Sequence, residues 1–212
     1  VATTGSHNIR IGDIGNDGDL DIFGANWNDA APNSAVIEMW ENKLNEQSIL
    51  SLNKWSYIQV DNSRSTFDNV NRYFGLAFYD VNGDGYKDII SGKYYYKNPG
   101  GDMTGAWTRV TFPINVDAML ATNVDDDTFV DVIAESLPNI YWLEAADAQG
   151  NSWAYIFIGT MPATPHVNGQ GYTLAQIIAS GKPEIVLSSG NGIYYFEIPA
   201  NPGSGNWPQT QI

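Results

Sequence analysis

Short apolar stretches separated by small and polar residues run along the whole chain. Each stretch is a few residues long, is rich in Val, Ile, Tyr, Phe and Trp, and is bounded by Gly, Asn, Asp or Pro. This composition is typical of β-strands joined by tight turns. Helical periodicity is almost absent from the chain, so the pattern predicts an all-β protein.

The stretches belong to a unit that occurs four times. Each unit opens on a nine-residue turn with acidic or amide residues at several odd-numbered positions, and two apolar residues follow position nine. An aromatic-rich stretch and a stretch that begins with Trp complete the unit. Three turns run 13–21, 80–88 and 123–131, and the fourth, 176–184, is a degenerate copy.

With the apolar stretch that precedes the turn counted as strand A, each unit holds four candidate strands, A to D, and the turn joins strands A and B. A four-stranded unit of about 40 to 50 residues is the blade of a β-propeller. Successive copies of the turn start 67, 43 and 53 residues apart. We predict a single propeller domain or propeller segment of four four-stranded antiparallel blades, at about 5–60, 70–112, 115–158 and 168–212.

Three consecutive tyrosines, Tyr94, Tyr95 and Tyr96, lie in strand C of the second unit. Side chains alternate between the two faces of a strand, so the middle ring should point away from its two neighbours. We interpret the run as packing between blades, and a stacking platform on the surface is the alternative.

The second unit carries a family resemblance. Its turn reads Asp80-Val-Asn-Gly-Asp-Gly-Tyr-Lys-Asp-Ile89 and is preceded by Gly75-Leu-Ala-Phe-Tyr79. This segment resembles the FG-GAP/VCBS repeat of integrin α-subunit propellers and of many bacterial and fungal extracellular propellers. The resemblance implies calcium at the A–B turns, an extracellular or periplasmic location, and a ring that usually has six to eight blades. We therefore expect a larger ring completed by another chain or segment, with closure of the four blades alone as the alternative.

The chemistry of the turns also favours calcium. Ca²⁺ takes six to eight oxygen ligands. In these turns the side chains of positions one, three, five and nine and the backbone carbonyl of position seven would supply them. Gly at position six permits the sharp turn. The predicted ligands of the two full sets are Asp80, Asn82, Asp84, Tyr86 and Asp88, and Asn123, Asp125, Asp127, Phe129 and Asp131. In the third turn Thr128 replaces the glycine, so we expect a strained or differently shaped turn.

The first turn is a third candidate calcium site. It offers Asp13, Asp17 and Asp21, with Gly15 at position three, so water, Asn16 or Asp19 would complete the site. No ion is expected in the fourth turn, whose odd positions are Gln176, Ile178, Ser180 and Glu184. An EF-hand is disfavoured because position twelve is never Glu and the flanks are strand-like. Recurrence of an acid at position nine argues against ordinary solvated turns, and we expect the ions to stabilise the fold.

Candidate ligand residues gather on the face opposite these turns, where segments entering strand A from several blades should converge. Both histidines of the chain fall in such segments. The predicted ligand-binding residues are His7, Asn71, Arg72, Tyr73, Asp117, His166, Asn168 and Gln170. Polar side chains of this kind hydrogen-bond sugar hydroxyls. The alternative is that they only hydrogen-bond the loops in which they lie.

A catalytic function is a second hypothesis for this face. The aromatic strands and the segment Pro165-His-Val-Asn-Gly-Gln170 resemble those of propeller-fold polysaccharide lyases. If the protein is a lyase of a uronic-acid-containing glycan, Arg72 would neutralise the carboxylate. His7, His166 or Tyr73 would then move the proton.

Composition narrows the functional classes. The 212 residues contain 24 Asp and Glu against 10 Lys and Arg, which gives a net charge of −14 and disfavours a nucleic-acid partner. Cysteine is absent, which excludes disulfides and thiolate zinc sites. No apolar run is long enough to cross a membrane. The start at Val1 favours a processed or partial chain.

These patterns together predict an extracellular, calcium-stabilised propeller that acts in carbohydrate recognition or processing. The ligand surface would be the face opposite the calcium turns. A polysaccharide lyase is the first alternative, and a protein-binding adhesion scaffold is the second. Eleven of the 24 acidic residues lie in the first three turns, so much of the acidity forms the predicted ligand sets.

Overall fold

The structure is a computed structural model that describes residues 6–26, 37–42, 55–64, 75–101, 103–165 and 169–212. These residues form four antiparallel sheets of four strands each, and neighbours in sequence are neighbours in each sheet. The first two sheets are β1 (Ser6–Gly12), β2 (Asp21–Asn26), β3 (Ile37–Asn42) and β4 (Trp55–Asp61), then β5 (Ala77–Tyr79), β6 (Asp88–Ser91), β7 (Tyr94–Lys97) and β8 (Thr108–Thr111). The last two are β9 (Asp117–Thr122), β10 (Asp131–Ser136), β11 (Asn139–Ala145) and β12 (Trp153–Thr160), then β13 (Tyr172–Ala175), β14 (Glu184–Ser189), β15 (Gly192–Phe196) and β16 (Gln209–Gln211).

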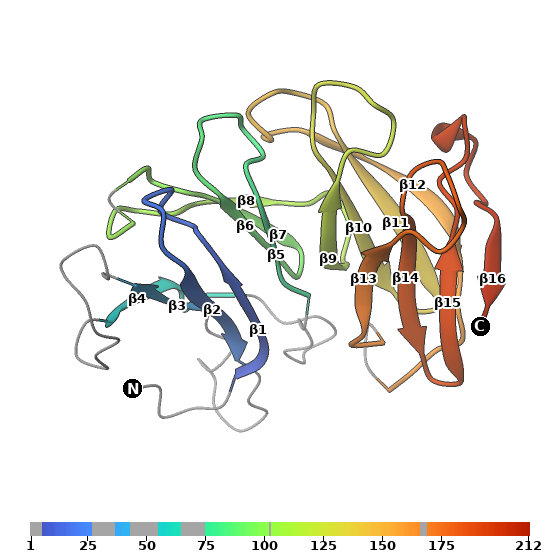
Figure 1. The fold of residues 1–212 in the computed structure, drawn as a ribbon, viewed down its shortest axis with the longest axis horizontal. Helices are drawn as coiled ribbons and strands as arrows, with labels where there is room; N and C mark the ends of the chain where they lie inside the picture. The colour runs from blue at the N-terminus through green and yellow to red at the C-terminus, as the bar shows by residue number, and fades with distance from the viewer. Residues whose placement is uncertain (1–5, 27–36, 43–54, 65–74, 102, 166–168) are drawn as a thin grey trace.

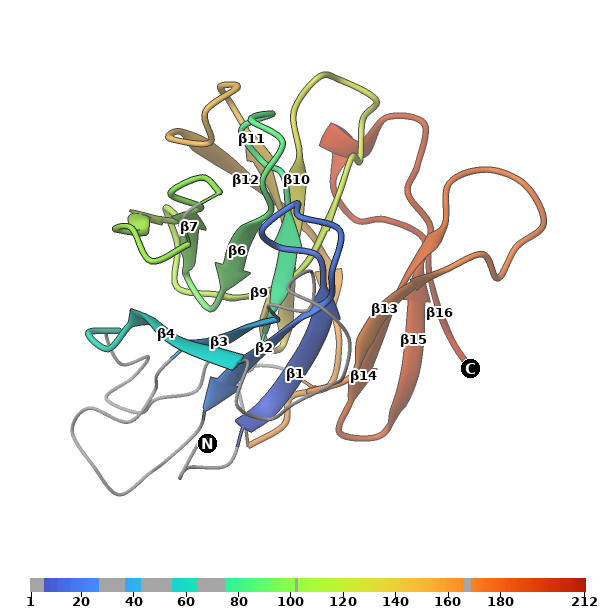
Figure 2. The same cartoon turned by 60° about the vertical axis from the view of Figure 1, so that its left-hand side comes forward.

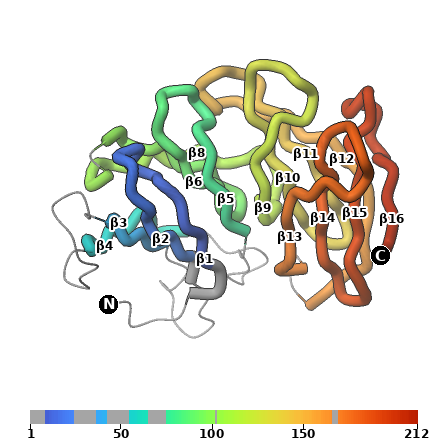
Figure 3. Tube along the Cα trace, viewed as in Figure 1, coloured from blue at the N-terminus to red at the C-terminus, as the bar shows by residue number. Residues whose placement is uncertain are grey.

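The four sheets are the blades of a β-propeller, as the repeat predicts. They follow one another in sequence order around a common axis, with β1, β5, β9 and β13 innermost (Figure 1; Figure 3). The innermost strand β9 packs beside β5, β6 and β13. Near the axis the Arg10 guanidinium lies 5.0 Å from the centre of the Tyr172 ring, whose hydroxyl accepts a hydrogen bond from the Leu76 N–H at 2.9 Å. Figure 2 shows the first and last blades from the side.

The hydrophobic core lies between the blades. The second and third blades each present one row of residues to the blade before and another row to the blade after. Phe23 and Met39 of the first blade, for example, pack with Ile89 and Tyr96 of the second, and all four are fully buried. Such interfaces between sheets give a repeat protein a continuous core although no single blade could bury its apolar faces alone.

The tyrosine run follows this arrangement. Tyr94 and Tyr96 belong to the cluster between the first and second blades, and Tyr95 belongs to the cluster between the second and third. All three rings are almost completely buried. Packing between blades is therefore confirmed for this run, and the alternative of a surface stacking platform is wrong.

Helical structure is sparse in the described segments, where the 3-10 turn η2 (Pro202–Ser204) precedes β16. None of the described residues forms a helix long and apolar enough to cross a membrane.

Candidate functional site

The acid at position nine of each turn is buried and holds the backbone of its own turn. Its carboxylate accepts a hydrogen bond from the N–H of position two at 2.7–2.9 Å in all four blades. The pairs are Asp21 with Ile14, Asp88 with Val81, Asp131 with Val124, and Glu184 with Ile177. The sequence argument that a turn needs no carboxylate at this position is therefore wrong, because the carboxylate has a structural task even in the fourth blade.

Burial disfavours the ionised form of this acid in the first three blades, whereas in the fourth blade hydrogen bonds from the Ile177 and Ile178 N–H groups lower the pKa of Glu184. Desolvation raises the pKa of Asp88 to about 6 and that of Asp131 to about 7, although backbone N–H donors oppose the rise. Acids of the same turn add to it, through Asp84 in the second blade and Asp125 in the third. A divalent cation in the turn would favour the ionised form of each of these groups.

The second turn is the most regular of the predicted calcium sites. Asp80 accepts hydrogen bonds from the N–H groups of Asp84 at 3.1 Å and Gly85 at 2.9 Å. Asn82 Nδ2 donates to Asp84 Oδ2 at 2.9 Å, so the side chains of positions three and five lie in contact. Gly85, at position six, has a φ of +90°, which a residue with a Cβ rarely adopts.

The third turn has a different shape, as the replacement of glycine by Thr128 predicts. Position four is left-handed in all three turns, at Asn16, Gly83 and Asp126, but position six is left-handed only where it is glycine, and Thr128 does not adopt this conformation. The ammonium of Lys182, from the fourth blade, forms an ion pair with Asp126 at 2.8 Å and donates to the Val124 carbonyl. A lysine therefore brings positive charge to this turn.

The fourth turn is closed by an amide. Gln176 Nε2 donates to the carbonyls of Ile178 at 2.7 Å and Ser180 at 3.1 Å. These hydrogen bonds connect positions one, three and five, which in the second and third turns carry predicted calcium ligands.

The donor chemistry of the first three turns fits calcium, because carboxylate, amide and carbonyl oxygens are the ligands that this ion prefers. In the segments that the structure describes, however, no three acidic or histidine side chains converge into a metal-binding group. The amide and backbone carbonyl oxygens of the turns would supply the remaining calcium ligands.

Most of the residues predicted for the opposite face lie outside the described residues. These are Asn71, Arg72, Tyr73, His166 and Asn168, and the backbone of His7 lies in β1. Of the remaining two, Asp117 is fully buried, and Gln170 has a left-handed backbone with a φ of +65°.

Asp117 belongs to a pair of buried carboxyls that anchor the segments entering the neighbouring blades. Asp117 and Glu135 lie opposite each other on β9 and β10, and both side chains are fully buried. Asp117 Oδ1 accepts a hydrogen bond from the Gly75 N–H at 2.8 Å, and Glu135 Oε2 accepts one from the Gly169 N–H at 2.9 Å. The role of Asp117 that the structure shows is thus to hold the start of the second blade against the third.

Stability should depend on the protonation of Glu135. Burial, together with the charge of Asp117, raises the pKa of Glu135 to about 8 from its usual value of 4.5, so the folded state binds the proton more tightly than the unfolded state. The stability from this group is fully present below pH 4.5 and is lost as the pH rises through 8, by at most about 1.4 kcal/mol per pH unit.

The variant Glu135→Gln, which resembles the protonated carboxyl, is the matched comparison. Urea unfolding across this pH range should show the wild type losing stability relative to Glu135→Gln as the pH rises. Parallel profiles for the two proteins would contradict the prediction.

A cavity of about 310 Å³ opens between the first and second blades, and the sequence analysis did not predict it. Its lining comes from β4 and the residues that follow it, from β7, and from β8 and the residue before it. Its lining combines two amide side chains, an ion pair, a hydroxyl and two aromatic rings. The lining residues are Gln59, Val60, Asp61, Asn62, Ser63, Tyr96, Trp107 and Arg109.

An ion pair fixes the polar side of this cavity. Arg109 Nη1 lies 2.9 Å from Asp61 Oδ2, and Tyr96 donates its hydroxyl proton to the same oxygen at 2.8 Å. Burial alone would raise the pKa of Asp61, but hydrogen bonds from Ser63, Tyr96 and Arg109 outweigh it and hold that pKa below its usual value. Asp61 is therefore ionised at neutral pH. The Arg109 guanidinium also lies 4.7 Å from the centre of the Tyr94 ring, which limits its motion.

One sequence signal for this cavity was available. Arg109 occupies the position of strand D at which the other blades have Tyr57, Tyr155 and Gln209. A charged residue at a position that is uncharged in the other copies indicates a contact that the other blades lack. Its partner Asp61 comes from another blade, 48 residues earlier, and only the fold brings the two together.

Comparison with known proteins supports the fold. No family model matches the sequence, and no curated protein matches it either. The structure is similar to that of a lectin from Agrocybe aegerita, described as specifically recognising non-reducing terminal N-acetylglucosamine, with a TM-score of 0.55 and 17% sequence identity. The match covers 99% of this chain and 53% of the lectin chain, so the chain spans about half the length of the lectin. At this identity the likeness shows the propeller fold alone.

Proposed function

We propose that the protein is an extracellular β-propeller that binds carbohydrate and that calcium stabilises. The cavity between the first and second blades is the observation that carries the carbohydrate part. Its volume of about 310 Å³ lies at the lower end of the range of small-ligand sites, which is the size class of one or two sugar rings.

The lining of the cavity suits a sugar. The exposed amide of Asn62 can donate to and accept from hydroxyls, and the half-buried ring of Trp107 offers an apolar face for a pyranose. The Asp61–Arg109 pair is held by its own partners, so little ordering accompanies binding. The similarity in fold to a lectin guides the choice of glycans to screen.

A glycan-array screen of the 212-residue protein, followed by calorimetry on the best ligand, tests this proposal. Loss of a well-placed hydrogen bond in Asn62→Ala should weaken binding about tenfold. Gln149→Ala removes an exposed amide from the third blade and is the matched control, which should bind normally.

Three other results would overturn parts of the proposal. Absence of binding to any glycan would reject carbohydrate recognition and favour the adhesion scaffold. If His166→Ala or Arg72→Ala abolished binding while Asn62→Ala did not, the site would be the predicted opposite face. An unsaturated product absorbing in the ultraviolet would make the protein a lyase.

The calcium part has its own test. Ligands that bind only the folded state raise its stability, so chelation should lower the melting temperature by several degrees, and added Ca²⁺ should restore it. Asp80→Asn removes a charge from the second turn and should shrink this shift. A melting temperature that changes with neither chelator nor Ca²⁺ would reject calcium binding at the turns.

A further inference from the structure

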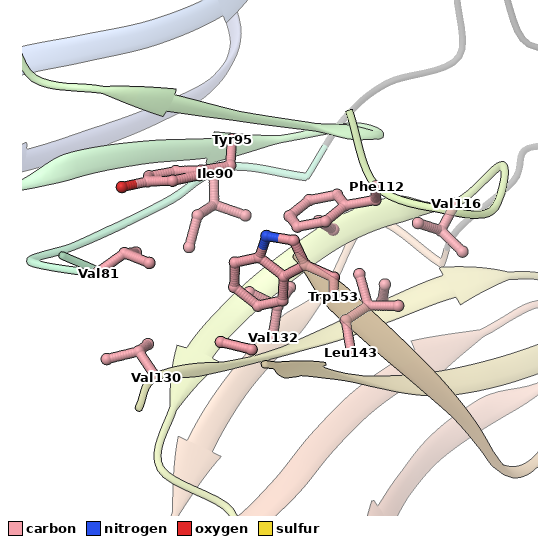
Figure 4. Packing of buried hydrophobic residues seen from close by; sticks show 12 residues of the cluster. Val81, Ile90, Tyr95, Phe112, Val116, Val130, Val132, Leu143 and Trp153 are labelled. Atoms are coloured by element: carbon pink, nitrogen blue, oxygen red, sulfur yellow. The ribbon is translucent and has the colours of Figure 1, made fainter. Parts of the chain in front are cut away.

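Every interface between blades in this chain uses the same two rows of residues. The first row of a blade contains the residue after position nine and its partners across the sheet, and the second row contains the next residue and its partners. In the second blade the second row includes Ile90 and Tyr95, which pack with Val132 and Leu143 from the first row of the third blade (Figure 4). In the other two interfaces, too, the second row of the earlier blade contacts the first row of the later blade. At all three interfaces, therefore, the second row of one blade packs on the first row of the next.

The first row of the first blade has no blade before it in this chain. It consists of Ile11, Ile22, Trp40 and Tyr57, which lie opposite one another across the four strands. Ile11 is 60% exposed and Tyr57 50%, and Ile9, on the same face of β1, is 53% exposed. Ile22 is half-buried, whereas the residues at its position in the other blades, Ile89, Val132 and Ile185, are fully buried. We name this surface the first-blade face.

The second row of the fourth blade has no blade after it in this chain. It consists of Thr173, Val186, Tyr195 and Thr210, and Ile193 lies on the same face and is 50% exposed. Val186 and Tyr195 are half-buried, whereas Ile90 and Tyr95, which occupy their positions in the second blade, are fully buried. We name this surface the fourth-blade face. The two faces lie at opposite ends of the row of blades (Figure 1).

We propose that the first-blade face is the docking surface for the fourth-blade face of a second copy of this chain. The chain itself carries both halves of an interface that it already forms three times, so a second copy supplies a matching row at each end. With two-fold symmetry, each copy covers the first-blade face of the other, and no apolar face stays open. The four blades match 53% of a longer propeller chain, so a second copy supplies about the missing length.

Sedimentation equilibrium or light scattering of the 212-residue protein tests the pairing. The expected mass is twice 23.3 kDa. Ile11→Glu on the first-blade face and Ile193→Lys on the fourth-blade face should each halve the mass, since each puts a charge into an apolar contact. Ile177→Glu changes an exposed isoleucine of the fourth turn, outside both faces, and should leave the mass unchanged. Both charged variants should melt as folded monomers, because the side chains of Ile11 and Ile193 are exposed in the single chain.

Mixing the two charged variants identifies which faces meet. A mixed pair has one native interface and one interface in which the introduced glutamate would face the introduced lysine, so the mixture should recover the double mass. A wild type with the mass of one chain would overturn the proposal, and further blades of a longer polypeptide would then be the occupant. Loss of pairing in Ile11→Glu alone would mean that two first-blade faces meet. A mass that keeps rising with concentration would overturn a closed pair.

Discussion

Replacing Gly75 with alanine should destabilise the protein by at least about 3 kcal/mol. A Cβ at this position would lie 1.9 Å from the Ala118 carbonyl oxygen and 2.7 Å from Asp117 Oδ1. The nearest atom belongs to the backbone of β9, which cannot rotate away as the end of a side chain can. The chain at Gly75 would have to move away from the third blade.

That movement would break two buried hydrogen bonds. The Gly75 N–H donates to Asp117 at 2.8 Å, and the Ser91 hydroxyl donates to the Gly75 carbonyl at 2.7 Å. Urea unfolding measures the loss. Gly203→Ala is the matched control, since its Cβ would meet no atom closer than 3.9 Å, and it should be nearly neutral. Equal stabilities of the two variants would show that the blades tolerate separation at the axis.

Replacing Trp153 with alanine should cost about 3 to 5 kcal/mol, the usual loss for a large aromatic side chain in a core. The indole packs at the interface of the second and third blades (Figure 4), with its ring edge-on to Phe112 at 5.0 Å and to Tyr95 at 6.3 Å. Its N–H donates to the Gly150 carbonyl at 2.8 Å. The residues that contact it come from both blades, so the cavity would lie in the interface itself.

Trp153→Phe separates packing from hydrogen bonding. It keeps an aromatic ring between the blades but removes the donor to Gly150, so its loss should be well below that of Trp153→Ala. Chemical unfolding of the three proteins gives the comparison. Equal losses for the two variants would show that the hydrogen bond, and not the packing, holds this interface.

The fold was predictable because the unit repeats. One turn followed by apolar residues is weak support for a strand, but the same order in four copies fixed the number of blades and the strands in each. The faces of Tyr94 to Tyr96 followed from alternation alone and are confirmed. Periodicity carries this information because each blade uses the same positions for packing.

The sites were less predictable for two physical reasons. The acid at position nine looked like a metal ligand, yet Glu184 binds the backbone of its turn as Asp88 does, and a carboxylate has the same sequence signature in either role. The cavity depends on Asp61 and Arg109, which belong to different blades. Repeats predict what the blades share, whereas a binding site depends on where one blade differs.

The amide of Gln176 has a consequence for how the molecule responds to its surroundings. Its two hydrogen bonds to Ile178 and Ser180 close the fourth turn with covalently attached atoms, which no chelator or dilution can remove. If calcium binds the first three turns as proposed, the turn of the fourth blade, from which Lys182 reaches Asp126 of the third, is the one that keeps its shape when calcium is removed. A fall in calcium would then act on the chain unevenly, on the first three blades and not on the fourth.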